Sequence, residues 1–265
     1  MPRVHIKVKN LRLQVPYFDQ GNVRGKSWLS TALGAAFSPP RRRFATLLDN
    51  VSFDIGRDGR VALLGRNGAG KTTLLRVLAG AFMPTSGRVE VVGSKQALLN
   101  LGLGFNTEAT IVENIYLRGT AMGMGLGTVR SLVDSILDFA ELEDVAGRRL
   151  STLSSGQRMR LGFAISTSMQ HDIMLMDEWF GAGDAAFVQK ARARMNDRVS
   201  GSRIVVLASH NFQMLRTVCK TGLVLEHGRL VYDGPIKDAI AAYKEIYHPA
   251  VQSTAGRAAE KACER

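Results

Sequence analysis

Apolar residues in this 265-residue chain fall into short runs separated by stretches with helical spacing. Residues 4–9 (VHIKVK) alternate apolar and basic positions, which is typical of a strand with one buried face. Residues 172–178 (DIMLMDE) are almost continuously apolar, as expected for a parallel strand covered on both faces. By these criteria, strands are also predicted at residues 49–55, 60–65, 87–93, 203–210 and 222–230.

Helical spacing marks much of the chain between these strands. A helix is predicted over residues 70–80, where it follows a glycine-rich loop and ends at Gly80. Three further patterns at residues 111–125, 128–147 and 152–166 predict a mostly helical insert over about residues 105–165, and a last helix is predicted at 235–247. Strands that alternate with helices predict an α/β protein built on a mostly parallel sheet.

Two segments lack a clear period. Residues 19–44 combine Gly, Ser, Pro-Pro and Arg-Arg-Arg, so we expect a basic, loop-rich insertion with a short helix around WLSTAL. Residues 248–265 are polar and rich in small residues, so we expect a disordered tail. The predicted domain is therefore residues 1–247.

The charge of the chain is strongly uneven. Its formal net charge is +12, and the first 50 residues hold nine lysines or arginines against two aspartates, a net +7. A basic face favours anionic partners, either nucleic acid or the inner leaflet of a membrane; a plain solvated surface is the other interpretation. Cys219 and Cys263 are far apart and lack metal-ligand spacing, which favours a reducing cytosol.

A phosphate-binding loop is predicted between the strand at 60–65 and the helix at 70–80. The sequence VALLGRNGAGKTTLL contains GxxxxGK[ST], in which glycines let successive N–H groups point at phosphate oxygens. Lys71 is expected at the β- and γ-phosphates, the Thr72 hydroxyl at Mg²⁺ and Thr73 at the α-phosphate. The predicted nucleotide-binding residues are Gly65, Arg66, Asn67, Gly68, Ala69, Gly70, Lys71, Thr72 and Thr73.

Three side chains at the ends of later strands complete a candidate catalytic site. Asp177 and Glu178 end the apolar strand, and adjacent strand residues point to opposite sides. We therefore assign Asp177 to the metal and Glu178 to the attacking water as general base. His210 ends the strand 203–210 and is expected to contact the γ-phosphate, because ligands bind at the carboxyl edge of a parallel sheet.

A second helix start with phosphate-binding chemistry follows the insert, at LSSGQ, residues 153–157. Hydroxyl groups and free N–H groups at a helix start suit a multiply charged anion. The order P-loop, helical insert, LSSGQ, IMLMDE, GAGD and SH resembles the nucleotide-binding subunits of ABC transporters, with Ser155 in place of the first glycine of the LSGGQ signature. In that family, the signature helix of one subunit caps the γ-phosphate held by the P-loop of another.

The resemblance covers about residues 4–245 and implies most of the function. It implies an ABC-type P-loop ATPase domain with an N-terminal antiparallel β part, ATP and Mg²⁺ as cofactors, and a head-to-tail homodimer that forms with ATP. The residues that would act on the partner's nucleotide are Ser154, Ser155, Gly156, Gln157 and, in GAGD, Asp184.

Other segments are similar to the ATPases that export O-antigens, capsules and teichoic acids. These are LQVPYFD, ALLNLGLGFNTEATIVENIYLRG, DEWFGAGDAAF and LEHGRLVYDGP. The resemblance implies a peripheral subunit on the cytoplasmic face of the bacterial inner membrane that powers export of a lipid-linked polysaccharide. A permease would contact residues 100–125, and no nucleic-acid partner is expected. From its charge, the basic insertion is expected to lie on anionic headgroups.

The sequence departs from the family pattern at two positions. No glutamine follows the strand after the P-loop helix, so Asn106, Glu108 or water would take its place at Mg²⁺. The usual adenine-stacking aromatic is absent near Val15, and Tyr17 or Phe18 would substitute, with Tyr17 favoured. Rival functions are an ABC exporter of a lipid, drug or metal, an ABC ATPase acting on nucleic acid or the ribosome, and a nucleotide-gated module without hydrolysis.

Overall fold

The computed structural model describes residues 4–19, 41–99, 104–178 and 185–247. The insertion between β1 and β2, the loop containing Asp184 and the predicted tail at 248–265 lie outside the described residues. The elements are β1 (His5–Asp19), β2 (Arg41–Ile55), β3 (Arg60–Leu64), α2 (Lys71–Ala79), β4 (Ser86–Val92), β5 (Lys95–Leu98), α3 (Ile111–Ala121), α4 (Leu126–Ala140), η1 (Glu143–Val145), η2 (Leu150–Thr152), α5 (Ser155–Ser166), β6 (Ile173–Asp177), α6 (Ala185–Gly201), β7 (Ile204–Ala208), α7 (Phe212–Val218), β8 (Thr221–Glu226), β9 (Arg229–Pro235) and α8 (Ile236–Tyr247).

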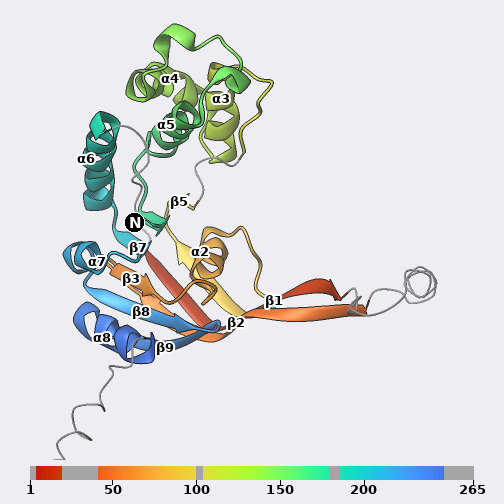
Figure 1. The fold of residues 1–265 in the computed structure, drawn as a ribbon, viewed down its shortest axis with the longest axis vertical. Helices are drawn as coiled ribbons and strands as arrows, with labels where there is room; N and C mark the ends of the chain where they lie inside the picture. The colour runs from red at the N-terminus through yellow and green to blue at the C-terminus, as the bar shows by residue number, and fades with distance from the viewer. Residues whose placement is uncertain (1–3, 20–40, 100–103, 179–184, 248–265) are drawn as a thin grey trace, which may run out of the picture.

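A six-stranded sheet in the order β5-β6-β7-β3-β8-β9 forms the centre of the protein (Figure 1). Its strands are parallel except for β9, which pairs antiparallel with β8. Alternate residues of the central strands enter opposite layers: Ile173 and Leu175 pack with α2, β1 and β2, whereas Met174 and Met176 pack with the helices on the other side. The predicted α/β class with a mostly parallel core is confirmed.

A second, three-stranded antiparallel sheet in the order β2-β1-β4 covers α2 and one side of the central sheet. Its β1–β2 pair continues outward as a long ribbon to Asp19 and Arg41 (Figure 1). Residues 41–44 therefore form a strand, whereas the sequence pattern predicts that the loop-rich insertion reaches residue 44. The sequence pattern does not reveal this strand, because residues 41–44 are held by pairing with residues 16–19 and show no alternation of apolar and polar side chains.

Other differences concern short or weakly patterned elements. The single strand predicted at 222–230 is the β8–β9 hairpin, which turns at His227 and Gly228 with φ of 45° and 78°. Such a turn usually shows Asn-Gly or Asp-Gly, so the pair His-Gly gives a weak signal. The elements β5, α6 and α7 also lie outside the predicted set; α6 buries few apolar residues among many alanines and arginines.

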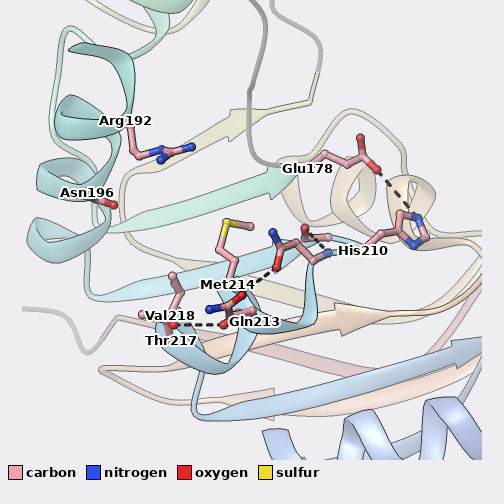
Figure 2. Close-up of a pocket in the computed structure, with 10 residues that line it drawn as sticks. Glu178, Arg192, Asn196, His210, Gln213, Met214, Thr217 and Val218 are labelled. Carbon is pink, nitrogen blue, oxygen red and sulfur yellow. Dashed lines mark hydrogen bonds and ion pairs between the residues drawn. The ribbon is translucent and has the colours of Figure 1, made fainter. Parts of the chain in front are cut away.

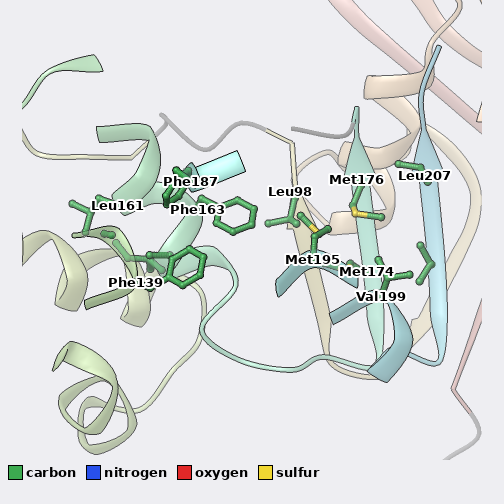
Figure 3. Packing of buried hydrophobic residues seen from close by; sticks show 14 of the residues in the cluster. Leu98, Phe139, Leu161, Phe163, Met174, Met176, Phe187, Met195, Val199 and Leu207 are labelled. Carbon is green, nitrogen blue, oxygen red and sulfur yellow. The ribbon is translucent and has the colours of Figure 1, made fainter. Parts of the chain in front are cut away.

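The helical insert is joined to the central body through α6. Phe139 of α4, Phe163 of α5 and Phe187 of α6 pack with ring centroids 5.6–6.1 Å apart (Figure 3). Beside them, Arg160 of α5 binds Glu141 at 2.5 Å and lies over the ring of Phe187. These contacts fix α5, and therefore its first turn, relative to α4 and α6.

Two findings bear on the environment of the chain. Over the described residues, none of the helices combines the length and apolarity that crossing a bilayer requires. Cys219 is a buried free thiol, and burial raises its pKa to about 12, so it stays protonated and unreactive near neutral pH.

Candidate nucleotide-binding and catalytic site

The loop between β3 and α2 has the curled backbone that the sequence predicts. Gly65, Gly68 and Gly70 all have positive φ, at 153°, 82° and 104°. At Gly65 a Cβ would lie 2.6 Å from the carbonyl oxygen of Leu225, so only glycine fits. The N–H of Leu74 bonds to Gly70 O and opens α2, so the N–H groups of the first turn of this helix are available to an anion, whereas the Ala69 N–H bonds to Arg66 O.

Lys71 is a buried cation at the base of this loop, with a relative exposure of 9%. Its Nζ donates to Gly65 O at 2.6 Å and to Arg66 O at 3.1 Å. Burial lowers the pKa of this ammonium, and the carboxylates of Asp177 and Glu178 oppose that shift. The loop carbonyls thus fix the position of the ammonium, and the nearby carboxylates favour its charged form.

Asp177 ends β6 beside Ala208 of β7, at the carboxyl edge of the sheet. The Thr72 hydroxyl at the start of α2 donates a hydrogen bond to Oδ2 of Asp177. The structure therefore brings together the two residues assigned to Mg²⁺, although 105 positions separate them in the chain.

Glu178 and His210 lie together just beyond the strand ends. The N–H of Glu178 donates to Ala208 O, and the residue has a φ of 69°, which is strained for a non-glycine residue by about 1–3 kcal/mol. This conformation separates its side chain from that of Asp177. The Glu178 Oε1 lies 3.9 Å from His210 Nε2, and both side chains are exposed (Figure 2).

One cavity of about 730 Å³ collects these residues. It is lined by Thr46, Leu47, Arg66, Asn67, Gly68, Gly70, Lys71, Thr72, Thr73, Asp177, Glu178, His210, His227 and Gly228. Of the predicted loop residues, Gly65 and Ala69 shape the loop without lining the cavity.

Four lining residues lie outside the set predicted from the sequence: Thr46, Leu47, His227 and Gly228. Contacts between segments distant in sequence bring them there. The backbone of Gly228 is so close to β2 that a Cβ would lie 2.5 Å from Leu47 O, and the Gly228 N–H bonds to Ala69 O. The available signal was the turn after β8, at the same carboxyl edge as the phosphate loop.

Tyr17 and Asn106, assigned to the adenine and to Mg²⁺, also lie outside the lining of this cavity. Tyr17 pairs with Arg43 on the β1–β2 ribbon and is 44% exposed. The side-chain oxygen of Asn106 accepts from the Glu108 N–H at 3.0 Å, and the Asn106 N–H donates to Asn114. The side chain of Phe18 and the whole of Asp184 lie outside the described residues.

The signature residues stand at the exposed start of α5. Ser154 and Gln157 form a capping box, in which the Ser154 hydroxyl accepts from Gln157 N–H and the Gln157 amide oxygen accepts from Ser154 N–H. Ser154 and Ser155 are exposed, and Gly156 and Gln157 are half-buried. None of the four lines the cavity described above, so this helix start is not part of its own nucleotide cavity.

The cavity fits a nucleoside triphosphate with a divalent cation. It offers loop N–H groups and an ammonium for the phosphates, and a hydroxyl with a carboxylate for the cation. Across the described residues, groups of three or more His, Cys, Asp or Glu that could hold a metal are absent. Mg²⁺ usually takes one or two protein ligands together with substrate phosphates and water, and Thr72 with Asp177 would supply such ligands here.

Comparisons with known proteins agree on the family and the fold. The family model described as ABC transporter matches residues 48–181. The O-antigen export system ATP-binding protein RfbE of Yersinia enterocolitica is 43% identical over 71% of this chain and 78% of its own length. The teichoic acids export ATP-binding protein TagH of Bacillus anthracis is 34% identical over 75% of this chain but only 36% of its own length. The solved dimeric, post-hydrolysis ATP-binding cassette MJ0796, bound to ADP and Pi, superposes with a TM-score of 0.63 at 19% identity, covering 87% of this chain and 98% of that one.

Proposed function

This chain belongs to the ABC transporter family, as an ATP-binding subunit, and from that premise we propose that it hydrolyses ATP to power a membrane permease. The cargo is a lipid-linked polysaccharide of the O-antigen or teichoic-acid kind, exported across the inner membrane. The relatives of known role support this cargo, because exporters of O-antigen and of teichoic acid both resemble the chain. The observation that carries the proposal is the single cavity that joins the phosphate loop to Asp177, Glu178 and His210.

The phosphate loop and six side chains of the cavity have roles in hydrolysis. The loop N–H groups and Lys71 bind the phosphates, and Thr73 is assigned to the α-phosphate. Thr72 and Asp177 would hold Mg²⁺, which would neutralise charge on the phosphate oxygens. Glu178 accepts a proton from the attacking water while the oxygen of that water bonds to the γ-phosphorus. The bond from that phosphorus to the bridging oxygen breaks, ADP keeps the electron pair, and inorganic phosphate leaves. His210 donates a hydrogen bond to the γ-phosphate.

The active unit is a head-to-tail homodimer. The exposed start of α5 lies outside the lining of its own nucleotide cavity and offers hydroxyl and N–H donors, so a second copy can place it against the γ-phosphate. Asp184 is assigned to the same interface from the sequence alone. Because ATP contacts both subunits only in the closed dimer, it stabilises that state over the open one and drives the permease between two states.

The permease contact is assigned to the helical insert. Leu117 of α3 and Leu126 of α4 are large apolar side chains with exposures of 48% and 66%. Their position within or next to the predicted contact region at residues 100–125 supports an interface with a membrane subunit.

The basic insertion is proposed to lie against anionic headgroups of the membrane. Arg43 is exposed on the ribbon that leads to it, as are Tyr17 at 44% and Phe44 at 60%. Basic and aromatic side chains favour the membrane–water interface. The peripheral, inner-membrane location of the chain is part of this proposal.

Neutralising Arg41, Arg42 and Arg43 together tests this contact. Each basic charge near an anionic surface contributes about 1 kcal/mol, so the triple glutamine variant should bind liposomes containing an anionic lipid about 10²-fold more weakly in a flotation assay. The matched control replaces Arg57, Arg88 and Arg216, which are exposed elsewhere, and should bind nearly as wild type does. Equal binding by the two triple variants would refute the assignment.

Co-purification with the permease encoded beside it tests the function as a whole. The complex should hydrolyse ATP and contain a lipid-linked glycan identifiable by mass spectrometry. A bound drug-like molecule, lipid or metal without glycan would favour another exporter class, and stimulation by nucleic acid would favour a non-transport ATPase. Absence of hydrolysis by the assembled complex would favour a nucleotide-gated binding module.

A further inference from the structure

A second cavity of about 560 Å³ lies on the other side of the catalytic pair (Figure 2). Glu178 and His210 line both this cavity and the nucleotide cavity. The remaining wall comes from α6, through Arg192 and Asn196, and from the segment that runs from the end of β7 into α7. Glu178 and His210 therefore stand where the two cavities meet.

The polar groups of this second cavity suit an anion. In Figure 2, Arg192 extends from α6 into the space opposite Glu178. Within the described part of the chain, Arg192 has no ion pair, and the side chains of Asn196 and Gln213 have no hydrogen-bond partner. Other polar groups of the cavity make internal hydrogen bonds: Asn211 Oδ1 accepts from Met214 N–H, and Thr217 Oγ1 donates to Gln213 O. Among the residues that the structure describes, one guanidinium and two side-chain amides thus remain available to a ligand.

On the basis of the proposed hydrolysis, we propose that this cavity is a transient binding site for inorganic phosphate as it leaves the nucleotide cavity. In the closed dimer, the partner's α5 covers one side of the cleaved phosphate and ADP occupies the phosphate loop on another. The remaining path for the phosphate runs past Glu178 and His210 into the second cavity, toward Arg192. At this point Glu178 carries the proton of the attacking water and is neutral, so the doubly charged phosphate is not held back by it and is attracted by the Arg192 guanidinium ahead.

This route sets the order of product release. Phosphate passes the catalytic pair and reaches Arg192 while ADP and both subunits remain in place. The dimer then separates without the γ-phosphate contacts that held it closed. Arg192 is accordingly a binding residue for a product and takes no part in bond cleavage.

Transient kinetics on the full-length protein with ATP and Mg²⁺ separate cleavage from release. Acid quench measures phosphate formed, and a fluorescent phosphate-binding protein measures free phosphate. For Arg192→Ala, loss of a charge-assisted contact should slow phosphate release about tenfold, so that free phosphate lags behind phosphate formed. The rate of cleavage should stay within twofold of wild type. Arg192→Glu should lengthen the lag, and Arg192→Lys should restore at least half of the release rate.

Arg216→Ala is the matched control, because Arg216 is exposed on α7 but does not line the cavity. It should release phosphate at the wild-type rate. The proposal is overturned if Arg192→Ala and Arg192→Glu release phosphate as fast as they form it, or if they impair ATP-dependent dimerisation in size exclusion. Absence of acid-quench phosphate in the wild type would instead refute the proposed hydrolysis, so the two failures are distinguishable.

Discussion

Replacing Glu178 by glutamine lowers steady-state ATP turnover about 10²- to 10⁴-fold, the usual contribution of a general base. The amide keeps the size of the carboxylate but cannot accept the proton of the attacking water. Glu178 is exposed at the edge of the sheet and makes its backbone hydrogen bond through its own N–H, so the fold should persist. ATP binding should also persist, because Lys71, Thr72 and Asp177 are unchanged.

The same variant should accumulate as an ATP-held dimer, since the nucleotide that joins the subunits is no longer cleaved. Size exclusion with and without ATP measures this, and a phosphate-release assay measures turnover. Glu143→Gln, at an exposed carboxylate outside the cavity, is the control and should behave as wild type. Full activity of Glu178→Gln would show that another group takes the proton.

Replacing Ser154 by arginine abolishes both ATP-dependent dimerisation and hydrolysis while sparing nucleotide binding to the single subunit. Ser154 is exposed at the helix start and lies outside the lining of its own cavity. A bulky side chain there obstructs only a neighbour. Loss of the capping hydroxyl costs about 1 kcal/mol of stability, which leaves most domains folded.

Fluorescent ATP titration, size exclusion and an ATPase assay together measure this result. Ser154→Ala removes the cap without bulk and separates the two effects, whereas Ser200→Arg adds the same side chain at an exposed position on α6. Hydrolysis that survives Ser154→Arg would refute the role of α5 across the dimer.

The parts of the fold that the sequence predicts are those with a local cause. Continuous apolar runs identify β6 and β7, and the glycine-rich loop followed by Lys71 identifies the start of α2. The outer ribbon at residues 41–44 is different, because its strand depends on pairing with residues 16–19 rather than on its own pattern. Likewise, α6 is fixed by the packing of Phe187 against Phe139 and Phe163, which are distant in sequence.

The candidate site divides in the same way. Lys71, Asp177 and His210 follow buried strands or a motif, and the structure brings them to one cavity. Leu47 and His227 line that cavity only because the β8–β9 turn packs against β2, a contact that no local pattern reveals. Tyr17 lies on the β1–β2 ribbon and does not line that cavity, so its assignment to the adenine stays a prediction.

The central claim is that one subunit holds the phosphate loop while another supplies the helix start that completes the site. The most direct test measures ATP turnover per subunit against protein concentration, from well below to well above the dimerisation midpoint in ATP. The account predicts that turnover per subunit rises with concentration and reaches a plateau when the dimer is saturated. A rate per subunit that stays constant down to concentrations where only monomer is present would contradict it.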